Sequence, residues 1–318
     1  MAKDGRNRTA PSGLRHRYYL VLATVVFVLL FCGQPAPAPA SEQLPKTLHV
    51  AFSSRVFPDI DQGDAQVAME LWARELARKA GIHQAKVTIF TDPKQIEESV
   101  RSGEMHVITL PALEYLANRP QLPLVPAYVS ANKTGPAMDL LLIVHRSSGI
   151  RTVADLRGKR LITPPLTAHE PAKLWLSALM GTRSGPGVRY FDKVTDKTKP
   201  SQAVMAVFFR QFDAAVVRRG SFETCKAVNP QLGRELAIIA ESKSLVGEIT
   251  CLPATIGTRM KLAIDAAAAS LHETAVGKQM ATLFQIDRVI PFKPTYLTGL
   301  EELLRHREQR RTRKEARP

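Results

Sequence analysis

The stretch LHVAFSSRVFPDIDQGDAQVAMELWARELARKAG, residues 48–81, decides the fold class. It opens with the short apolar segment Leu48–Phe52, which predicts a strand, and continues through a polar turn. From Asp64 onward apolar residues recur at helical spacing until Gly81, a residue type that often follows a helix C-terminus. The stretch therefore reads as a strand, a loop and a helix, which is the unit of an α/β protein.

The same order of elements repeats in the next part of the chain. Lys86–Phe90 predicts a second strand, Pro93–Ser102 a helix, and His106–Leu110 a third strand that runs into a helix through Tyr115. Strands that alternate with helices pack as a mainly parallel sheet with helices on its faces. We expect that architecture here.

The pattern changes where two apolar segments follow one another with no helix between them. Leu122–Val129 and Asp139–His145 are therefore predicted to be extended crossovers, and the hinge, between two lobes. The alternation then resumes, with helices expected at Val153–Leu156, Pro171–Met180 and Ser201–Arg210 and strands at Lys159–Thr163, Val188–Phe191 and Asp213–Val217. The chain exceeds the usual size of a single core, so the expected fold is a two-lobed α/β protein.

The N-terminus is typical of an export signal. Basic residues precede the apolar stretch Tyr18–Phe31, and Ala38-Pro39-Ala40 forms an A-x-A cleavage site before Ser41. The apolar stretch is shorter than the roughly 20 residues that span a bilayer, which favours a cleaved signal over a retained anchor. Lipid attachment to Cys32 is an alternative, but the bulky Phe31 before it disfavours the processing that attaches a lipid. We expect an exported, soluble product.

The chain is basic, with 44 Lys and Arg residues against 29 Asp and Glu. Part of the excess lies in residues 305–318, RHREQRRTRKEARP, where no apolar face is visible and disorder is expected. A basic exported protein attracts small anions, anionic lipid or nucleic acid. Nucleic acid is the weakest of these partners, because no stripe of interleaved basic and aromatic residues is present.

Cysteine usage fits an exported chain. After the signal is removed, Cys225 and Cys251 remain as an even pair in an oxidising compartment, which predicts a disulfide between them. Two separately buried thiols are the alternative, because spacing alone does not establish proximity. There is no CxxC motif and no Cys/His cluster, so no metal or cofactor is predicted.

A ligand site is expected at the carboxyl ends of the strands, where loops and helix N-termini meet in open α/β sheets. Guanidinium groups there match carboxylate or phosphate oxygens, and hydroxyl groups complete the shell, so a small anionic ligand is predicted. The candidate ligand-binding residues are Ser53, Ser54, Arg55, Thr109, Leu110, Tyr115, Thr163, Thr167, Ala168, His169, Arg218 and Arg219.

The loop in LITPPLTAHEPAKLWL, residues 161–176, has the composition of such a site. Two prolines end the strand, and Pro171 suits the first turn of a helix whose unpaired amides can hold an anion. The alternative is that Thr167 or Glu170 only caps the helix and that the arginines are solvated.

A catalytic function for His169 and Glu170 is not favoured. The sequence contains no HExxH spacing, nucleophile elbow or Gly-rich phosphate loop, so no enzyme is predicted. Asp213 and His106 stand at strand starts, away from the site, and are expected to be structural. A core-packing role is expected for the aromatic residues Trp72, Trp175, Phe208 and Phe209, which lie at helical spacing among apolar residues.

Four segments carry a family resemblance. They are SVRSGEMHVITLPALEYLA (99–117), TVADLRGKRLITP (152–164), FDAAVVRRGSFETCKAVNPQL (212–232) and GKQMATLFQIDRVIPFKPTYLTGLEELL (277–304). In this order they resemble the periplasmic phosphate/phosphite/phosphonate-binding proteins, solute receptors of ABC importers in the type 2 periplasmic binding protein class. The resemblance implies two lobes, each a mainly parallel sheet flanked by helices, with a ligand cleft between them.

The chain departs from the family pattern at the expected site. The family's run of small hydroxyl residues is replaced by Pro165-Leu166-Thr167-Ala168, and the usual acidic residue after the last strand of the second lobe by Arg218-Arg219. Thr109-Leu110 stands where a Gly-Pro type turn is usual. A phosphonate is therefore one candidate ligand, and another oxyanion or a carboxylate fits as well.

The resemblance implies a periplasmic, monomeric receptor that delivers a small anion to an ABC permease. The expected organisation is a signal peptide (1–40), a discontinuous first lobe (46–138 and 252–304), a second lobe (139–251) and a basic disordered tail (305–318). The alternatives are a sensory partner of a membrane histidine kinase or receptor, an exported enzyme that uses His169 and Glu170, and a protein whose basic tail binds anionic lipid.

Overall fold

The computed structural model describes residues 43–57, 60–133, 135–136, 138–166, 169–181, 190–197, 199–243, 245–284 and 286–315. The chain from Leu44 onward forms one compact unit. The predicted signal peptide lies outside the described residues. Within the described part of the chain, no helix is long and apolar enough to cross a membrane.

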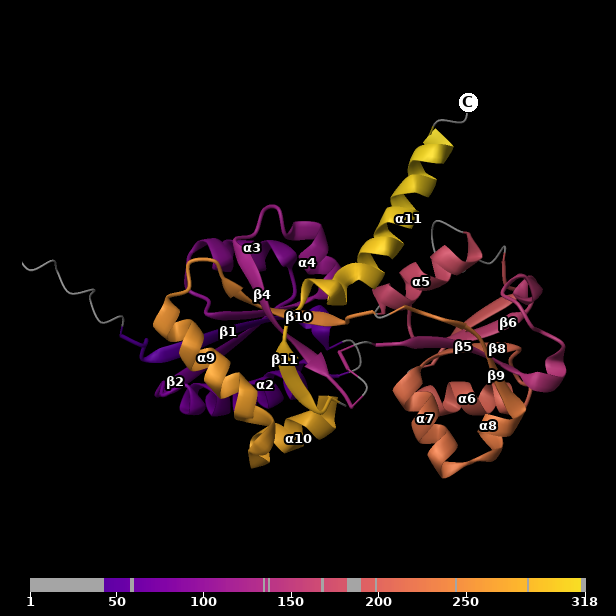
Figure 1. Cartoon of the computed structure of the whole chain (residues 1–318), viewed down its shortest axis with the longest axis horizontal. Helices are drawn as coiled ribbons and strands as arrows, with labels where there is room; N and C mark the ends of the chain where they lie inside the picture. Colours follow the sequence, from indigo (N-terminus) through magenta and orange to yellow (C-terminus); the bar gives the residue numbers. More distant parts are fainter. Residues whose placement is uncertain are drawn as a thin grey trace, which may run out of the picture. The chain divides into compact units, whose positions relative to one another are not determined.

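The first of two sheets has the strand order β11-β4-β10-β3-β1-β2 (Figure 1). Its strands are β1 (Thr47–Ser53), β2 (Gln84–Phe90), β3 (Val107–Pro111), β4 (Leu124–Ala131), β10 (Glu248–Pro253) and β11 (Arg288–Pro291). The pairs β1–β2 and β1–β3 are parallel, whereas β10 is antiparallel to both β3 and β4, and β11 is antiparallel to β4.

The second sheet has the order β7-β6-β8-β5-β9. Its strands are β5 (Leu140–His145), β6 (Arg160–Thr163), β7 (Lys193–Asp196), β8 (Ala214–Arg218) and β9 (Leu236–Glu241). All six residues of β5 are buried, because the sheet has a hydrophobic layer on each face. Leu140, Leu142 and Val144 pack in one layer and Leu141 and Ile143 in the other, as the two-residue period of a strand requires.

The predicted fold class is confirmed, with a correction to the strand directions. Strands within the predicted βα alternation are parallel, as in β6–β7 and β6–β8, but β5 is antiparallel to β8 and β9. The segments predicted as crossovers are largely the strands β4 and β5 themselves. Each of these strands enters its sheet without a crossover helix, so it can run opposite to its neighbours.

Two predicted boundaries also move. The prediction placed residues 248–251 in the second lobe. These residues are part of strand β10, which pairs with β3 and β4, so they belong to the first sheet. The strand expected at Val188–Phe191 falls partly outside the described residues, and the strand that the structure contains there, β7, begins at Lys193.

Helices cover both faces of each sheet. In the first lobe these are α2 (Gln62–Lys79), α3 (Pro93–Arg101), α4 (Ala112–Asn118), α9 (Thr258–Ser270) and α10 (Ala275–Phe284), with the short 3₁₀ helices η1 (Ser54–Val56), η4 (Leu271–Glu273) and η5 (Pro294–Leu297). In the second they are α5 (Glu170–Met180), α6 (Pro200–Phe208), α7 (Arg219–Val228) and α8 (Gln231–Glu235), with η2 (Arg146–Ser148) and η3 (Ala154–Leu156).

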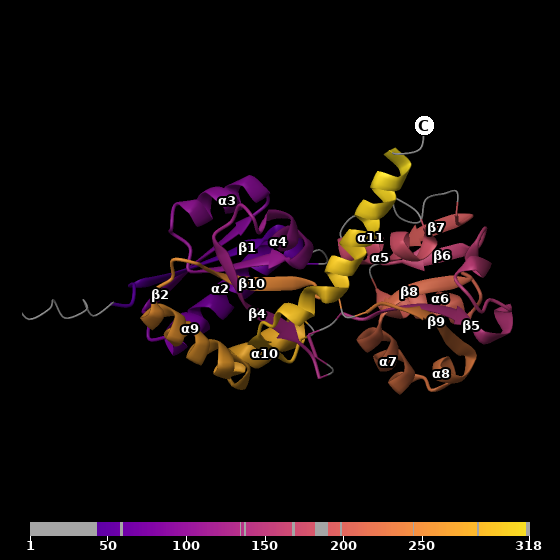
Figure 2. The ribbon, with the colours of Figure 1, turned by 45° about the horizontal axis from the view of Figure 1, so that its top comes forward.

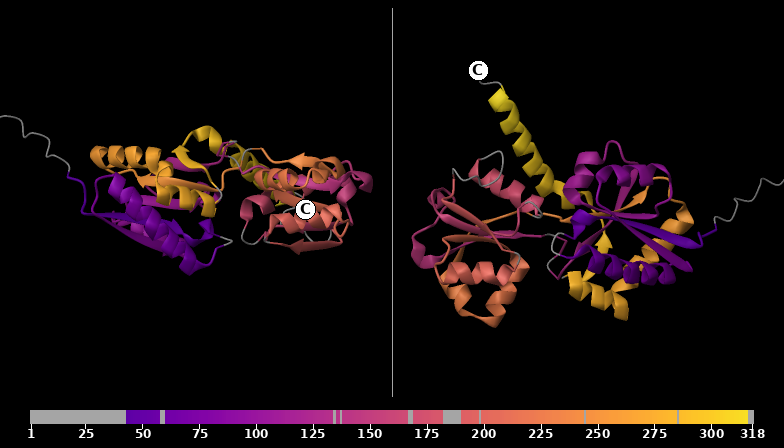
Figure 3. Two further views of the ribbon diagram at one scale, coloured as in Figure 1. Left: turned by 90° about the horizontal axis from the view of Figure 1, so that it is seen from below. Right: turned by 180° about the vertical axis from the view of Figure 1, so that it is seen from behind.

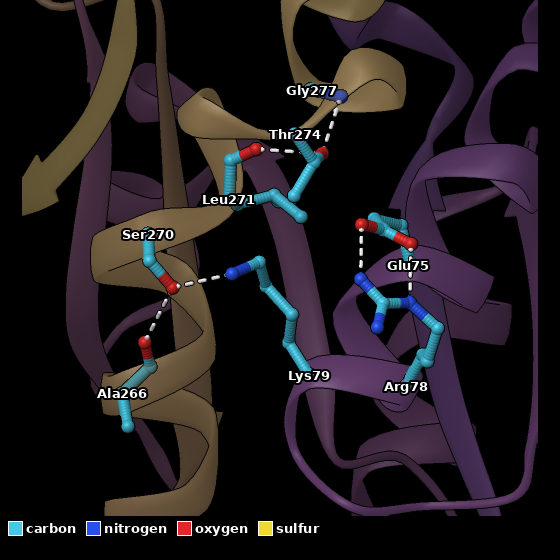
Figure 4. A network of polar contacts seen from close by, with 8 residues as sticks. All are labelled: Glu75, Arg78, Lys79, Ala266, Ser270, Leu271, Thr274 and Gly277. Atoms are coloured by element: carbon cyan, nitrogen blue, oxygen red, sulfur yellow. Dashed lines mark hydrogen bonds and ion pairs between the residues drawn. The ribbon is translucent and has the colours of Figure 1, made fainter.

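A polar network ties α2, α9 and α10 together on one face of the first sheet (Figure 4). Lys79 donates to the hydroxyl of Ser270 at 2.9 Å, which joins α2 to the end of α9. The Thr274 hydroxyl accepts from the Gly277 amide at 2.9 Å and donates to the Leu271 carbonyl at 3.0 Å. A Cβ atom on Gly277 would lie 1.8 Å from the Leu271 carbonyl oxygen, so this close approach requires glycine.

The C-terminal segment is helical, and the prediction of a disordered tail from Arg305 is wrong. Helix α11 (Thr298–Glu315) carries the fully buried Leu300 in its first turn and continues to Glu315. Figure 2 and the rear view in Figure 3 show it passing beside α5. Arg310 donates to the carbonyl oxygens of Ser177 and Ala178 at 3.2 and 3.0 Å. These tertiary contacts stabilise the helix, whose polar sequence from Arg305 onward has no apolar face to pack on its own.

The predicted disulfide is not formed. Cys225 and Cys251 are both free thiols, because Cys225 lies on α7 of the second lobe and Cys251 is buried in β10 of the first sheet.

Among the aromatic residues, Trp175 is buried as expected, but Phe209 is 61 % exposed, which corrects its predicted core role. Asp213 accepts from the backbone and guanidinium nitrogens of Arg160, which agrees with its predicted structural role.

Candidate functional site

Residues from both sheets line a cavity of about 1590 Å³. The first sheet contributes the ends of β3, β4 and β10 together with η1 and α4, and the second contributes β8 and the first turns of α5 and α7. Pockets that enclose a drug-sized ligand usually measure about 300–1,000 Å³, so this cavity has ample room for a small solute.

Part of the predicted site is brought together here. The cavity is lined by Ser54, Arg55, Thr109, His169, Arg218 and Arg219. Ser54, Arg55, His169 and Arg219 follow strands, and Thr109 and Arg218 lie within or at the end of theirs, so four different strands contribute to the cavity near their carboxyl ends. That they bind a ligand stays a prediction.

The other predicted residues are placed elsewhere. Leu110 and Tyr115 are buried in the core, and Ser53 and Thr163 are buried with hydrogen bonds to carboxylates. Ser53 donates to Glu114 at 3.3 Å, and Thr163 donates to Asp196 at 3.1 Å. None of these side chains lines the cavity. Thr167 and Ala168 lie outside the described residues.

Arg55 faces a carboxylate that the sequence analysis did not single out. The Arg55 guanidinium lies 3.7 Å from Glu114, whose side chain is only 8 % exposed. Burial raises the pKa of Glu114, the nearby Arg55 and the Ser53 hydroxyl hold that pKa down, and Glu170 raises it further. Glu114 therefore has a positive and a hydroxyl partner on its own lobe.

A row of hydroxyl groups crosses the first sheet at the cavity. Thr109 on β3 and Thr250 on β10 are paired in register, and their hydroxyl oxygens lie 2.9 Å apart. Glu248 is two residues from Thr250 and so projects from the same face of β10. On the neighbouring strand β4, Ser130 hydrogen-bonds to Glu248. Thr109, Thr250, Glu248 and Ser130 all line the cavity.

Glu248 is a partly buried carboxylate opposite the second lobe. Burial raises its pKa, while the hydrogen bond from Ser130 and the positive charge of Arg218 hold that pKa down. Sequence reasoning missed Glu248, Thr250 and Ser130, because they lie on antiparallel strands outside the βα alternation that located the strand ends. No local motif marks them.

The two adjacent arginines of the second lobe differ in their surroundings. Arg219 forms an ion pair with Glu241 at the end of β9 and lies 3.8 Å from Asp139, which precedes β5. It therefore links the two segments through which the chain enters and leaves the second sheet. Arg218 is exposed at the end of β8 and faces the cavity. Of the predicted pair, Arg218 is thus the one whose charge is directed at Glu248 and the cavity.

The expected start of the loop helix is confirmed. Helix α5 begins at Glu170, one residue before the predicted Pro171, which lies in its first turn, and His169 stands at the N-cap position. His169, Glu170 and Pro171 line the cavity. Among the described residues, no group of three or more His, Cys, Asp or Glu side chains could hold a metal ion.

Comparison with known proteins identifies the family. The model of the family described as "ABC transporter, phosphonate, periplasmic substrate-binding protein" matches residues 55–297. The chain belongs to this family. Membership implies a periplasmic location, an anionic phosphonate-like solute and an ABC transporter in the membrane as partner. The family is one of transport proteins rather than of enzymes.

Solved structures share the type 2 periplasmic binding protein fold. A binding-protein component of an ABC phosphonate transporter from Pseudomonas aeruginosa has a TM-score of 0.54 and 14 % identity, covering 85 % of this chain and 89 % of its own. PhnD1 from Prochlorococcus marinus in complex with methylphosphonate has a TM-score of 0.53 and 15 % identity, covering 82 % and 98 %. A Xanthomonas citri protein bound to chloride has a TM-score of 0.55 and 14 % identity, covering 85 % and 100 %. No curated protein matches the chain in sequence.

Proposed function

We propose that the protein is an exported receptor that captures a small oxyanion in this cavity and delivers it to the permease of an ABC importer. The observation that carries the proposal is that Arg55 from the first lobe and Arg218 from the second line one cavity. Two guanidinium groups on opposite lobes can grip one anion from both sides, which couples binding to closure of the lobes.

Hydroxyl groups complete the proposed shell. Thr109 and Thr250 stand side by side on the first sheet, and Ser54 lies next to Arg55 in η1. On the second lobe, Gly220 and Ser221 form the first turn of α7 and line the cavity. Amides at the start of a helix favour negative charge, so this turn adds donors to those of Arg218.

The same proposal covers processing of the N-terminus. We infer that residues 1–40 are removed on export and that the product begins near Ser41, since the A-x-A site precedes that residue. The compact unit, which starts at Leu44, would then be left whole.

Thermal unfolding against a panel of phosphate, methylphosphonate, sulfate, nitrate and small carboxylates tests the proposal. At about 100 times its dissociation constant a ligand stabilises the native state by roughly 2.7 kcal/mol, which moves the midpoint by several degrees. Arg218→Ala should remove the shift. Arg146→Ala is the matched control, because Arg146 is an exposed arginine of η2 that does not line the cavity. If no anion moves the midpoint of the parent protein, the receptor function is wrong.

A further inference from the structure

The C-terminal part of helix α11 has a composition that the fold does not require. Residues 305–315 include no apolar residue, and residues 305–318 contain seven Lys and Arg residues against two Glu residues. The five consecutive residues 305–309 are all exposed and cover more than one helical turn, so solvent surrounds the helix there. A helix that is polar all round gains nothing from core packing. Its charges are therefore presented outward.

The negative charges near the start of α11 are already paired with cations elsewhere on the protein. Glu301 lies 2.9 Å from Arg119 at the end of α4, and Glu302 lies 3.2 Å from Lys243, which follows β9. The first turns of the helix are thus fixed on the fold and electrically balanced. The basic excess is confined to residues 305–318.

The contact with α5 keeps the basic segment helical and in one position. Arg310 donates to the carbonyl oxygens of Ser177 and Ala178, which carry no formal charge and leave the guanidinium charge in place. Residues 305–315 span about 16 Å at the rise of an α-helix. Charges carried on a preformed helix of this length can meet a charged surface together, with little further loss of chain entropy.

An anionic lipid surface is the partner whose chemistry fits this segment. A helix that docks in a protein groove needs apolar anchors on one face, and residues 305–315 contain none. Adsorption to an anionic bilayer needs only a cluster of about four to eight Lys and Arg residues. The transporter that the family serves lies in a membrane, so a lipid surface is next to the working protein.

We propose that residues 305–315 of α11 form an electrostatic docking surface that holds the protein on the anionic phospholipids around its transporter. The inference goes beyond the receptor function and does not depend on which anion the cavity binds. Confinement to the membrane surface raises the local concentration of the protein at a membrane partner, as a tether does.

Vesicle sedimentation tests the proposal on the chain from residue 41 onward, because the apolar stretch 18–31 would itself bind lipid. The protein should bind vesicles of phosphatidylcholine with about 30 % phosphatidylglycerol at least about tenfold more tightly than pure phosphatidylcholine vesicles. Raising the salt concentration from about 0.05 M to about 0.5 M should release it, because screening shortens the reach of the surface potential. No binding, or binding that is equal on neutral vesicles, overturns the proposal.

A variant with four substitutions locates the surface on α11. It keeps Arg310, and with it the α5 contact, and Arg307, which lines the cavity. The substitutions are Arg305→Gln, Arg311→Gln, Arg313→Gln and Lys314→Gln. Affinity for the anionic vesicles should fall by at least about a hundredfold, since each charge near the surface contributes a factor of about five.

The matched control removes four exposed cations that lie on other elements and do not line the cavity. Its substitutions are Arg74→Gln, Lys86→Gln, Lys94→Gln and Arg146→Gln. This control should bind anionic vesicles within about threefold of the parent. If it loses as much affinity as the α11 variant, net charge rather than α11 drives binding, and the proposal is wrong.

A truncation provides a second route if the α11 variant does not fold. Deleting residues 311–318 removes four of the seven basic residues and leaves Arg310 in place, so it should give the same loss of vesicle binding. Unchanged binding after this deletion overturns the proposal. A parent protein that binds the vesicles but responds to no anion of the thermal panel contradicts the receptor function alone.

Discussion

Arg310, near the end of the last helix, donates hydrogen bonds to the carbonyl oxygens of Ser177 and Ala178 in the last turn of α5. The last carbonyl groups of a helix have no partner within the helix, and a positive charge there is favourable. Helix α11 begins beside the first sheet, and α5 packs on the second, so this contact joins the two parts of the chain. The opposite end of α5 lines the cavity.

Replacing Arg310 with Ala should destabilise the protein by about 1 kcal/mol, because two half-buried hydrogen bonds to carbonyl groups are lost. Urea unfolding measures the change. Arg305→Ala removes the same charge from an exposed position of the same helix and should stay within about 0.5 kcal/mol of the parent. Equal effects of the two variants would mean that the α5 contact contributes nothing specific.

Gly277→Ala should destabilise the protein by about 2 kcal/mol or more. The new methyl group would meet the Leu271 carbonyl oxygen at 1.8 Å, so the backbone of η4 or α10 has to move. Gly220→Ala is the comparison, since a methyl group there meets nothing within 4 Å in the first turn of α7. Thermal unfolding that ranks the two variants in the opposite order would contradict the packing of η4 against α10.

The two thiols should differ in reactivity. Cys251 is fully buried, and burial raises its pKa to about 12, so almost no thiolate is present at pH 8. Cys225 is partly exposed on α7, and burial raises its pKa to a lesser degree. A thiol reagent at pH 8 should modify Cys225 in the folded protein and Cys251 only after unfolding. A bridged peptide containing both residues in a non-reducing digest would contradict the free thiols.

The Arg160–Asp213 pair should make stability depend on pH in the acid range. The hydrogen bond from the Arg160 guanidinium lowers the pKa of Asp213, so the folded state favours the ionised carboxylate. Its contribution is present above the unfolded pKa, near 3.9, and is lost as the pH falls through the lower folded value.

Asp213→Asn should therefore be less stable than the parent at pH 7, and the difference should shrink as the pH is lowered from about 5 to about 2. Glu97→Gln, which removes an exposed pair with Arg101 on α3, should show little difference at any pH. Denaturant unfolding at a series of pH values measures both. A difference for Asp213→Asn that stays constant with pH would show that lost packing, not charge, is responsible.

Much of the fold was accessible from local sequence patterns. The opening strand and helix follow from the spacing of apolar residues, and the start of α5 was predicted to within one residue from Pro171. The segment of β5 was predicted to be extended and apolar, but as a crossover between the lobes rather than as a sheet strand. Of the candidate site, Arg55, Thr109 and Arg218 were placed at strand ends by the same reasoning and do line one cavity. Their role in binding is still a prediction.

Other features have no local signal. The antiparallel strand β10 carries Glu248 and Thr250 from a position more than 130 residues after Thr109 along the chain, and only sheet pairing brings them together. The separation of Cys225 from Cys251 and the helical C-terminus are likewise set by distant contacts.

The sequence by itself determined the type and order of most elements from β1 to β8 and the resemblance to the family, because hydrophobic periodicity and turn residues act over a few neighbouring positions. Only the tertiary structure decided the directions of the returning strands, the carboxylates that face the arginines, and the support of α11 by α5. These depend on contacts between remote segments, whose pairing is settled by packing and burial of the whole chain rather than by any short pattern.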